Sequence, residues 1–256
     1  MMHILNIAGY KFITLSDLPE RRSFFQEQAE AAHLKGTILL SPEGININLA
    51  GISENIAAFL QFLHNDPLLA DMTFRKSYSD VPPFKHMRVR IRKEIITLRQ
   101  PDIHPENQAA PDISPTELKK WLDEKREITL LDTRNAYETR FGTFKNAEHL
   151  NLEDFSEFPA AIDQVSREKP VVMFCTGGIR CEKAAWVLLN AGYSNVYQLK
   201  GGILNYFAKV GAAHYNGECF VFDERVAVDA SLQPTGTMQC LTCQGPIVAS
   251  CTQCQY

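Results

Sequence analysis

The sequence predicts two domains in tandem, an α+β domain followed by a doubly wound parallel α/β domain, and then a cysteine-rich C-terminal tail. Three observations lead to this prediction. The first hundred residues follow the order βαββαβ, residues 114–210 alternate buried strands with helices, and four of the seven cysteines lie after residue 239. A chain of 256 residues is long enough for two cores. We expect the domains at 1–100 and 114–210, a linker at 101–113 and an extension at 211–256.

Composition and charge are those of a soluble globular protein, with 45% hydrophobic residues and a net charge of −4. No apolar stretch approaches the length of a membrane span, and the N-terminus lacks a signal-peptide pattern. We therefore expect a cytoplasmic protein without a membrane partner. In that compartment, the seven cysteines indicate reactivity or metal binding rather than disulfides.

The N-terminal domain is predicted from its hydrophobic periodicity. Its expected elements are a strand at 3–12, a helix from the caps Ser16 or Asp17 to Leu34, strands at 36–40 and 45–50 around a turn at 42–44, a helix at 54–64 capped by Ser53, and a closing strand at 87–98. This βαββαβ order is typical of a ferredoxin-like split βαβ domain.

The predicted closing strand alternates apolar and basic residues. Its apolar set, expected to face the core, is Met87, Val89 and Ile91, and its basic set, expected on the opposite face, is Arg88, Arg90 and Arg92. Residues 75–99 contain eight basic and two acidic residues, a net charge of +6 in an acidic chain. A merely solvated face is the alternative, but this excess favours a polyanion.

RNA suits an exposed basic sheet, whereas the sequence has no DNA-reading motif. We therefore predict RNA rather than DNA as the partner. The predicted RNA-binding residues are Lys85, Arg88, Arg90, Arg92 and Lys93.

The second domain follows a proline-rich linker and opens at Ser114-Pro115-Thr116-Glu117, which has the pattern of a capping box. Its predicted elements are this helix, buried strands at 128–132, 171–174 and 195–199, and helices at 182–191, ending before Gly192, and at 203–210. Alternating strands and helices predict a parallel, doubly wound sheet.

The segment Cys175-Thr176-Gly177-Gly178-Ile179-Arg180-Cys181 lies between a predicted strand and a predicted helix. The glycines let the backbone N–H groups turn inward, and the helix dipole and Arg180 add positive potential. A thiol in this position has a depressed pKa, so Cys175 is predicted to be a nucleophile with Arg180 as its catalytic partner. The alternative is a structural cysteine beside a glycine turn.

This segment resembles the active loop of a rhodanese domain, in which the cysteine that corresponds to Cys175 carries a persulfide. Protein tyrosine phosphatases place five residues between cysteine and arginine, whereas this chain has four. The shorter loop suits a sulfur atom better than a phosphate group.

Asp132 and Arg134, and the turn that begins at Gly142, also resemble the rhodanese pattern. The chain departs from this pattern at Thr143 and Asn146, where many relatives have histidine and glycine. We expect Asp132 and Arg134 to brace the loops near Cys175.

The tail contains two Cys-x-x-Cys pairs, which are the usual knuckles of a tetrahedral zinc site. The four cysteines are Cys240, Cys243, Cys251 and Cys254, and the spacer between the pairs is shorter than usual. We predict a structural zinc ion, with free thiols or an oxidised pair as the alternative.

Three segments together resemble the tRNA uridine(34) hydroxylase family. They are Glu43-Gly44-Ile45-Asn46 in an N-terminal half that resembles an acylphosphatase-like domain, the loop from Cys175 to Lys183, and the segment from Gly217 to Arg225. This resemblance covers essentially the whole chain. It implies oxygen-dependent conversion of the wobble uridine of tRNA to 5-hydroxyuridine, with molecular oxygen as co-substrate. We find no haem, flavin or iron motif that would identify the oxygen-activating cofactor.

Two other functions are consistent with the residues. One is a sulfurtransferase that passes persulfide sulfur from Cys175, with Cys181 resolving the persulfide or forming a disulfide with Cys175. The other is a non-enzymatic RNA-binding or redox-sensing scaffold, against which the intact Cys175 loop argues.

Overall fold

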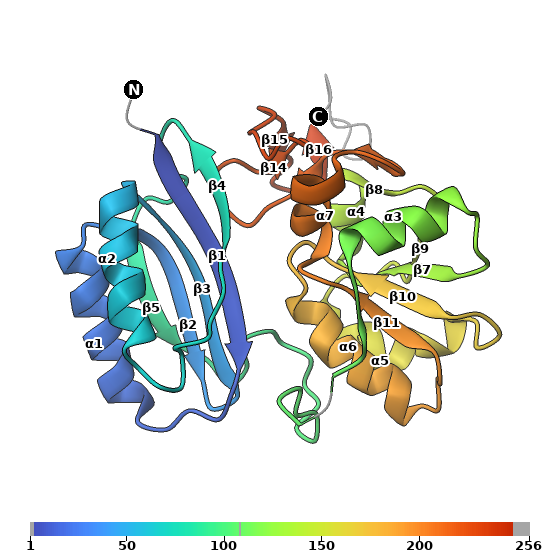
Figure 1. The fold of residues 1–256 in the computed structure, drawn as a ribbon, viewed down its shortest axis with the longest axis horizontal. Coiled ribbons are helices and arrows are strands. Elements are labelled where there is room, and N and C mark those ends of the chain that lie inside the picture. The colour runs from blue at the N-terminus through green and yellow to red at the C-terminus, as the bar shows by residue number, and fades with distance from the viewer. Residues whose placement is uncertain (1–2, 108, 248–256) are drawn as a thin grey trace. The chain divides into compact units, whose positions relative to one another are not determined.

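The structure, a computed structural model, describes residues 3–107 and 109–247. The chain divides into two compact units, Met1–Thr97 and Leu98–Tyr256. The predicted fold class is confirmed, since a ferredoxin-like unit precedes a parallel α/β unit (Figure 1). Within the described ranges, no helix is long and apolar enough to cross a membrane.

The first unit is a five-stranded sheet with two helices on one face (Figure 1). Its elements are β1 (Ile4–Phe12), α1 (Leu18–Ala31), β2 (Lys35–Ser41), β3 (Gly44–Gly51), α2 (Ser53–His64), β4 (Arg75–Ser79) and β5 (Met87–Ile91). The strand order is β4-β1-β3-β2-β5.

The strand that closes the split βαβ motif is β4, not the predicted strand at 87–98. β4 pairs antiparallel with β1, and β5 lies at the opposite edge, parallel to β2. The sequence signal of β4 is weak because Arg75-Lys76-Ser77-Tyr78-Ser79 contains no aliphatic side chain. β5 also ends at Ile91 rather than at Leu98.

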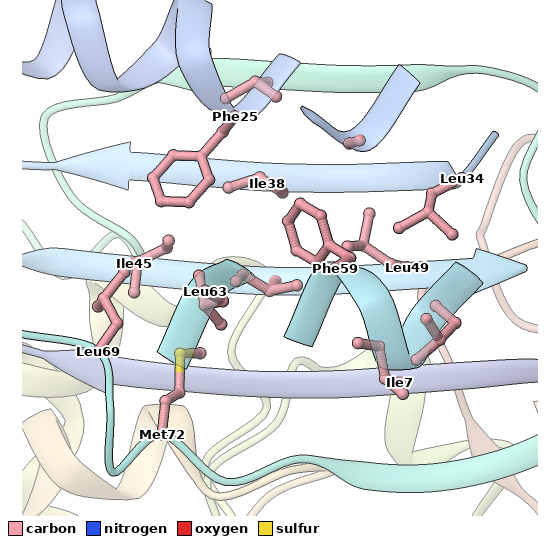
Figure 2. Packing of buried hydrophobic residues seen from close by; sticks show 14 of the residues in the cluster. Ile7, Phe25, Leu34, Ile38, Ile45, Leu49, Phe59, Leu63, Leu69 and Met72 are labelled. Carbon is pink, nitrogen blue, oxygen red and sulfur yellow. The ribbon is translucent and has the colours of Figure 1, made fainter. Parts of the chain in front are cut away.

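The core of the first unit lies between the sheet and its helices, as Figure 2 shows. Alternate residues of β2 and β3 point into it, and α1 and α2 contribute Phe25, Phe59 and Leu63. The helix starts differ in detail from the predicted caps. Asp17 precedes α1 without a side-chain capping bond, and Ile52 rather than Ser53 is the residue before α2.

The alternation of β5 is largely as predicted. Arg88 and Arg90 of β5 and Arg92, which follows the strand, are exposed, and Val89 is buried. We call Arg88, Arg90 and Arg92 the arginine strand. Ile91 is also exposed, contrary to the prediction, because it is the last residue of the strand. Side chains of α1 cover the strand edge, since Gln26 accepts from the Val89 N–H and Arg22 donates to the Val89 carbonyl.

The second unit has a five-stranded parallel sheet in the order β6-β11-β10-β7-β9, with helices on both faces (Figure 1). Its elements up to the last helix are β6 (Asp112–Ile113), α3 (Pro115–Asp123), β7 (Thr129–Asp132), α4 (Ala136–Thr139), β8 (Gly142–Phe144), β9 (Glu148–His149), α5 (Phe158–Ala161), β10 (Val171–Phe174), α6 (Ile179–Asn190), β11 (Val196–Leu199) and α7 (Gly202–Val210), with short 3-10 turns at Phe155–Glu157 and Ile162–Gln164.

Two local signals in this unit are confirmed. The Ser114 hydroxyl accepts from the Glu117 N–H at the start of α3, and Gly192 follows α6 in a left-handed conformation, as predicted. Helix α6, however, begins at Ile179 rather than at residue 182. Arg180 and Cys181 therefore lie in its first turn.

The segment after α7 folds onto the second unit. It forms β12 (Tyr215–Gly217), β13 (Cys219–Phe220), β14 (Ala227–Val228), β15 (Met238–Gln239) and β16 (Pro246–Ile247). β12 pairs antiparallel with β8, and Tyr215, Cys219 and Val221 join the core. The described part of the predicted extension, residues 211–247, therefore packs with this unit.

Candidate active site

Cys175 is positioned by the central strand of the parallel sheet. The four residues of β10 are buried, and Cys175 follows them directly at the carboxyl end of the strand. In open α/β sheets this edge is where ligands bind. Cys175 therefore lies, as the sequence predicts, directly after a buried strand, and its side chain is only 1% exposed.

The loop after Cys175 forms a cradle of backbone N–H groups. The Gly178 N–H donates to the Cys175 Sγ at 3.0 Å, and Gly178 adopts a φ of 101° that favours glycine. The carbonyl groups of the loop point the other way. Those of Cys175 and Thr176 accept from the N–H groups of Ile203 and Leu204 in the first turn of α7.

The first turn of α7 therefore packs against the loop that follows Cys175. This contact is not predicted from the sequence. A Cβ atom on Gly202 would lie 2.4 Å from the Cys175 carbonyl oxygen. Only glycine allows the helix to approach the loop so closely, and this approach fixes the direction of the loop carbonyls.

Arg180 is held by a buried ion pair. Its two terminal nitrogens donate to the Glu138 carboxylate at 2.5 and 2.7 Å, and the Glu138 side chain is completely buried. Glu138 also accepts from the Asn135 N–H, which is one half of a capping box at the start of α4. Asn135 and Glu138 carry a local helix signal, but nothing in the sequence indicates that Glu138 meets a residue 42 positions away.

Cys181 donates a hydrogen bond to Cys175 beside this ion pair. Burial raises the pKa of Cys175, but the hydrogen bond from Cys181, the charge of Arg180 and the N–H groups of residues 180 and 177 outweigh it and lower the pKa to about 5. Burial and the neighbouring Cys175 raise the pKa of Cys181 well above its ordinary value. At neutral pH, Cys175 is therefore the thiolate and Cys181 the thiol.

Asp132 and Arg134 form a second buried ion pair. The Arg134 Nη2 atom donates to Asp132 at 2.6 Å and to the Gly142 carbonyl at 2.7 Å, and the Thr143 hydroxyl donates to Asp132. Thr143 therefore has a structural partner at the position where the rhodanese pattern has histidine. Asn146 has a φ of 61°, a conformation that asparagine tolerates better than most residues, which explains its place where relatives have glycine.

The hairpin of β13 and β14 lies against the same site. The Thr176 hydroxyl is 3.5 Å from the Phe220 carbonyl, and the Arg180 guanidinium lies 5.7 Å from the centre of the Phe222 ring. The third buried cysteine, Cys219, stays protonated because burial raises its pKa to about 12. The hairpin is therefore part of the site, and no local sequence signal indicates that position.

The other predicted site residues do not belong to this cluster. The arginine strand, Lys85 and Lys93 belong to the first unit, where Lys85 and Lys93 are also exposed. Cys240 and Cys243 lie in the turn between β15 and β16, while Cys251 and Cys254 lie outside the described residues. Within residues 3–107 and 109–247, no group of three or more metal-ligating side chains is found.

A thiolate at the end of a central parallel strand, in a glycine cradle that leads into a helix, defines a rhodanese-like domain. The family model of the rhodanese-like domain matches residues 114–209, and the UPF0176 acylphosphatase like domain matches residues 4–95. A solved rhodanese-like domain from Anabaena is 22% identical, with a TM-score of 0.36, and covers 42% of this chain and 79% of that one.

The comparison with whole proteins is more specific. A tRNA uridine(34) hydroxylase from Cupriavidus metallidurans is 49% identical over 254 residues, which cover 96% of this chain and 90% of that protein. A second, from Paraburkholderia xenovorans, is 46% identical over an alignment that covers 98% of this chain and 92% of that protein. The chain belongs to the tRNA uridine(34) hydroxylase family.

Proposed function

We propose that this protein hydroxylates uridine 34 of tRNA, with molecular oxygen as the co-substrate. The observation that carries the proposal is the similarity over nearly the full chain to relatives named for this activity. One oxygen atom enters the C5–H bond of the base. The other leaves as water and draws its electrons from an external reductant.

Cys175 is the proposed nucleophile. Its thiolate would add to C6 of the uracil ring, which raises the electron density at C5 for attack on an oxygen species. Loss of the C5 proton and cleavage of the Sγ–C6 bond would then restore the double bond. Arg180 would keep the thiolate charged, and the N–H groups of Gly177 and Gly178 would hold the sulfur in place.

The arginine strand is the proposed tRNA-binding surface, together with Lys85 and Lys93. Its three arginine residues are exposed, and the register places Arg88 and Arg90 beside Thr37 and Leu39 on β2. Exposed guanidinium groups in a row can contact successive phosphates, and such contacts make binding dependent on salt. An anticodon loop suits this enzyme, since its bases can be splayed out at low cost.

One observation favours sulfur transfer as a second candidate. Cys175 is 1% exposed, so its own sulfur atom has little access to a base. A persulfide would place the reactive outer sulfur about 2 Å beyond Sγ. On this alternative, the product would be a thiolated uridine.

Labelled oxygen separates the two candidates. We expect tRNA from cells that contain this protein and grow under ¹⁸O₂ to carry the label in uridine 34, as measured by accurate-mass spectrometry of nucleosides. Accurate mass is needed because adding oxygen and exchanging oxygen for sulfur give the same nominal mass. An unlabelled product that contains sulfur would refute hydroxylation.

Two variants assign the chemistry to Cys175. Cys175→Ser should abolish the labelled product. Cys219→Ser is the matched control, because Cys219 is equally buried but remains a protonated thiol. Loss of product in the control alone would contradict the assignment.

A structural zinc ion is proposed for the two Cys-x-x-Cys pairs. In the described pair, the Cys240 N–H donates to the Gly245 carbonyl and the Gln244 N–H donates to the Cys240 carbonyl, which closes a tight turn between β15 and β16. Such a turn holds two thiols close together, as a zinc knuckle requires. The ion would be structural, because the pairs supply all four ligands.

A further inference from the structure

An exposed aromatic ring, that of Phe222, lies beside Arg180, the residue that acts on the Cys175 thiolate. Phe222 is 63% exposed and occupies the loop of the β13–β14 hairpin. Among the described residues of the second unit, it is the only phenylalanine, tyrosine or tryptophan that is exposed. A single exposed apolar side chain is common on protein surfaces, so exposure alone says little. Phe222 is distinguished by the hydrogen bonds and ring contacts that hold it in place and by its contact with Arg180.

The backbone around Phe222 is fixed by hydrogen bonds. The Val221 N–H donates to the Val226 carbonyl, and the Val226 N–H donates to the Asp223 carbonyl. The Asp223 carboxylate also accepts from the backbone N–H, Nε and Nη2 of Arg225. The loop is therefore a closed turn whose conformation is set before any ligand arrives.

The Phe222 ring packs against a cluster of other aromatic rings. Phe222 meets Phe220 edge-to-face, with centroids 5.1 Å apart and planes at 88°. Phe220 in turn packs against Tyr137 and Phe141. A cluster of this kind keeps the Phe222 ring in one orientation and leaves much of its surface in solvent.

The position of the ring relates it to the chemistry. The Arg180 guanidinium lies 5.7 Å from the Phe222 centroid, and the same charge lowers the pKa of Cys175. One side chain thus contacts the exposed ring and acts on the thiolate. The residues that follow Phe222 are Asp223, Glu224 and Arg225, so the ring has charged neighbours along the chain.

We propose that Phe222 is a binding residue that stacks on the pyrimidine ring of uridine 34 and presents it to Cys175. A flat ring with charged neighbours suits a base, whereas an apolar protein partner would need a wider apolar surface. Stacking of splayed-out bases on aromatic side chains is a general mode of RNA recognition. The inference rests on the proposed function for the identity of the base.

The test compares two anticodon stem–loop RNAs that differ only at position 34, where one has uridine and the other an abasic ribose. The full chain should bind the uridine RNA more tightly by about 5- to 150-fold, the range expected for one stacked base. Phe222→Ala should reduce this ratio to near one, and Phe222→Trp should retain it. Phe24→Ala is the matched control, because Phe24 is also exposed, at 52%, and lies in the first unit.

Two further measurements keep the inference separate from the proposed function. Alkylation of Cys175 as a function of pH should be unchanged in Phe222→Ala, which shows that the cradle is intact. Phe222→Trp should show fluorescence quenching by the uridine RNA and not by the abasic RNA. The inference would be overturned if wild-type protein bound the uridine and abasic RNAs with nearly equal affinity, or if Phe222→Ala left the ratio of the two affinities unchanged. This holds even if the protein incorporates labelled oxygen. If Phe222 made binding dependent on the base at position 34 but no labelled product formed, only the proposed function would be refuted.

Discussion

Replacing Cys181 by alanine should raise the pKa of Cys175. Burial raises the pKa of Cys175, and among the interactions that lower it the hydrogen bond from the Cys181 thiol is the largest. Cys181 is completely buried in the first turn of α6, so the truncation removes this donor without exposing a new surface. Serine at the same position keeps a hydroxyl donor and should preserve the low pKa.

The magnitude follows from the strength of one hydrogen bond to a charged acceptor, about 1.5–3 kcal/mol. A thiol is a weak donor, so the lower part of that range applies. Since about 1.36 kcal/mol corresponds to one pH unit, the pKa should rise by roughly 1–1.5 units. The wild-type value of about 5 would then become a value between about 6 and 6.5.

The assay is alkylation of the full chain by iodoacetamide at a series of pH values, followed by peptide mapping. The rate at Cys175 should rise as pH increases through its pKa, because the thiolate is the nucleophile. Cys181 and Cys219 should remain unmodified at acidic pH, since both have raised pKa values. An alanine variant with the wild-type midpoint, or a serine variant with a midpoint as high as that of alanine, would refute the assigned role of the Cys181 thiol.

Three other predictions concern the charges and the tail. Changing the arginine strand to glutamate should weaken tRNA binding and lower its salt slope by roughly 0.7–0.9 for each phosphate that is no longer neutralised; unchanged binding would mean that the strand is only solvated. The control makes the same charge change at exposed lysines of the second unit, Lys120, Lys169 and Lys209. Elemental analysis of the purified chain should find one zinc ion, which Cys240→Ser should remove, and metal-free protein would contradict the site. Glu138→Gln should lower the free energy of unfolding by about 3–5 kcal/mol, because Arg180 loses its buried partner, whereas denaturation of the surface variant Glu168→Gln should match wild type.

The parts of the fold that the sequence predicts correctly depend on local signals. Examples are the apolar run of β10, the glycines that follow it and the helix cap at Ser114. Each of these signals determines the structure of only the few residues around it. The prediction for the first unit is wrong where the signal is not local. β4 is polar, and it is a strand only because it pairs with β1. In the sequence, the more apolar β5 therefore looks like the better candidate for the closing strand.

The same distinction applies to the site. Cys175, Arg180 and the glycines can be predicted because their roles follow from spacing along one loop. Glu138 cannot, because its contact with Arg180 joins α4 to α6. The approach of Gly202 to the loop and the position of Phe222 likewise depend on how α7 and the β13–β14 hairpin fold over the end of the sheet.

The two buried ion pairs suggest why the site is built from charged residues at all. A buried pair adds little net stability, since removing its charges from water offsets their attraction. Arg180 with Glu138 and Arg134 with Asp132 are each electrically balanced, and the thiolate of Cys175 adds one further negative charge, which the Arg180 guanidinium stabilises. The pairs instead fix positions. Glu138 directs the Arg180 guanidinium, and Asp132 with Arg134 holds residues 142 and 143 beside β12. A low pKa at Cys175 then depends on groups that are already oriented, the Cys181 thiol, the Arg180 guanidinium and the N–H groups of the loop, so little reorganisation is needed for the thiolate to form.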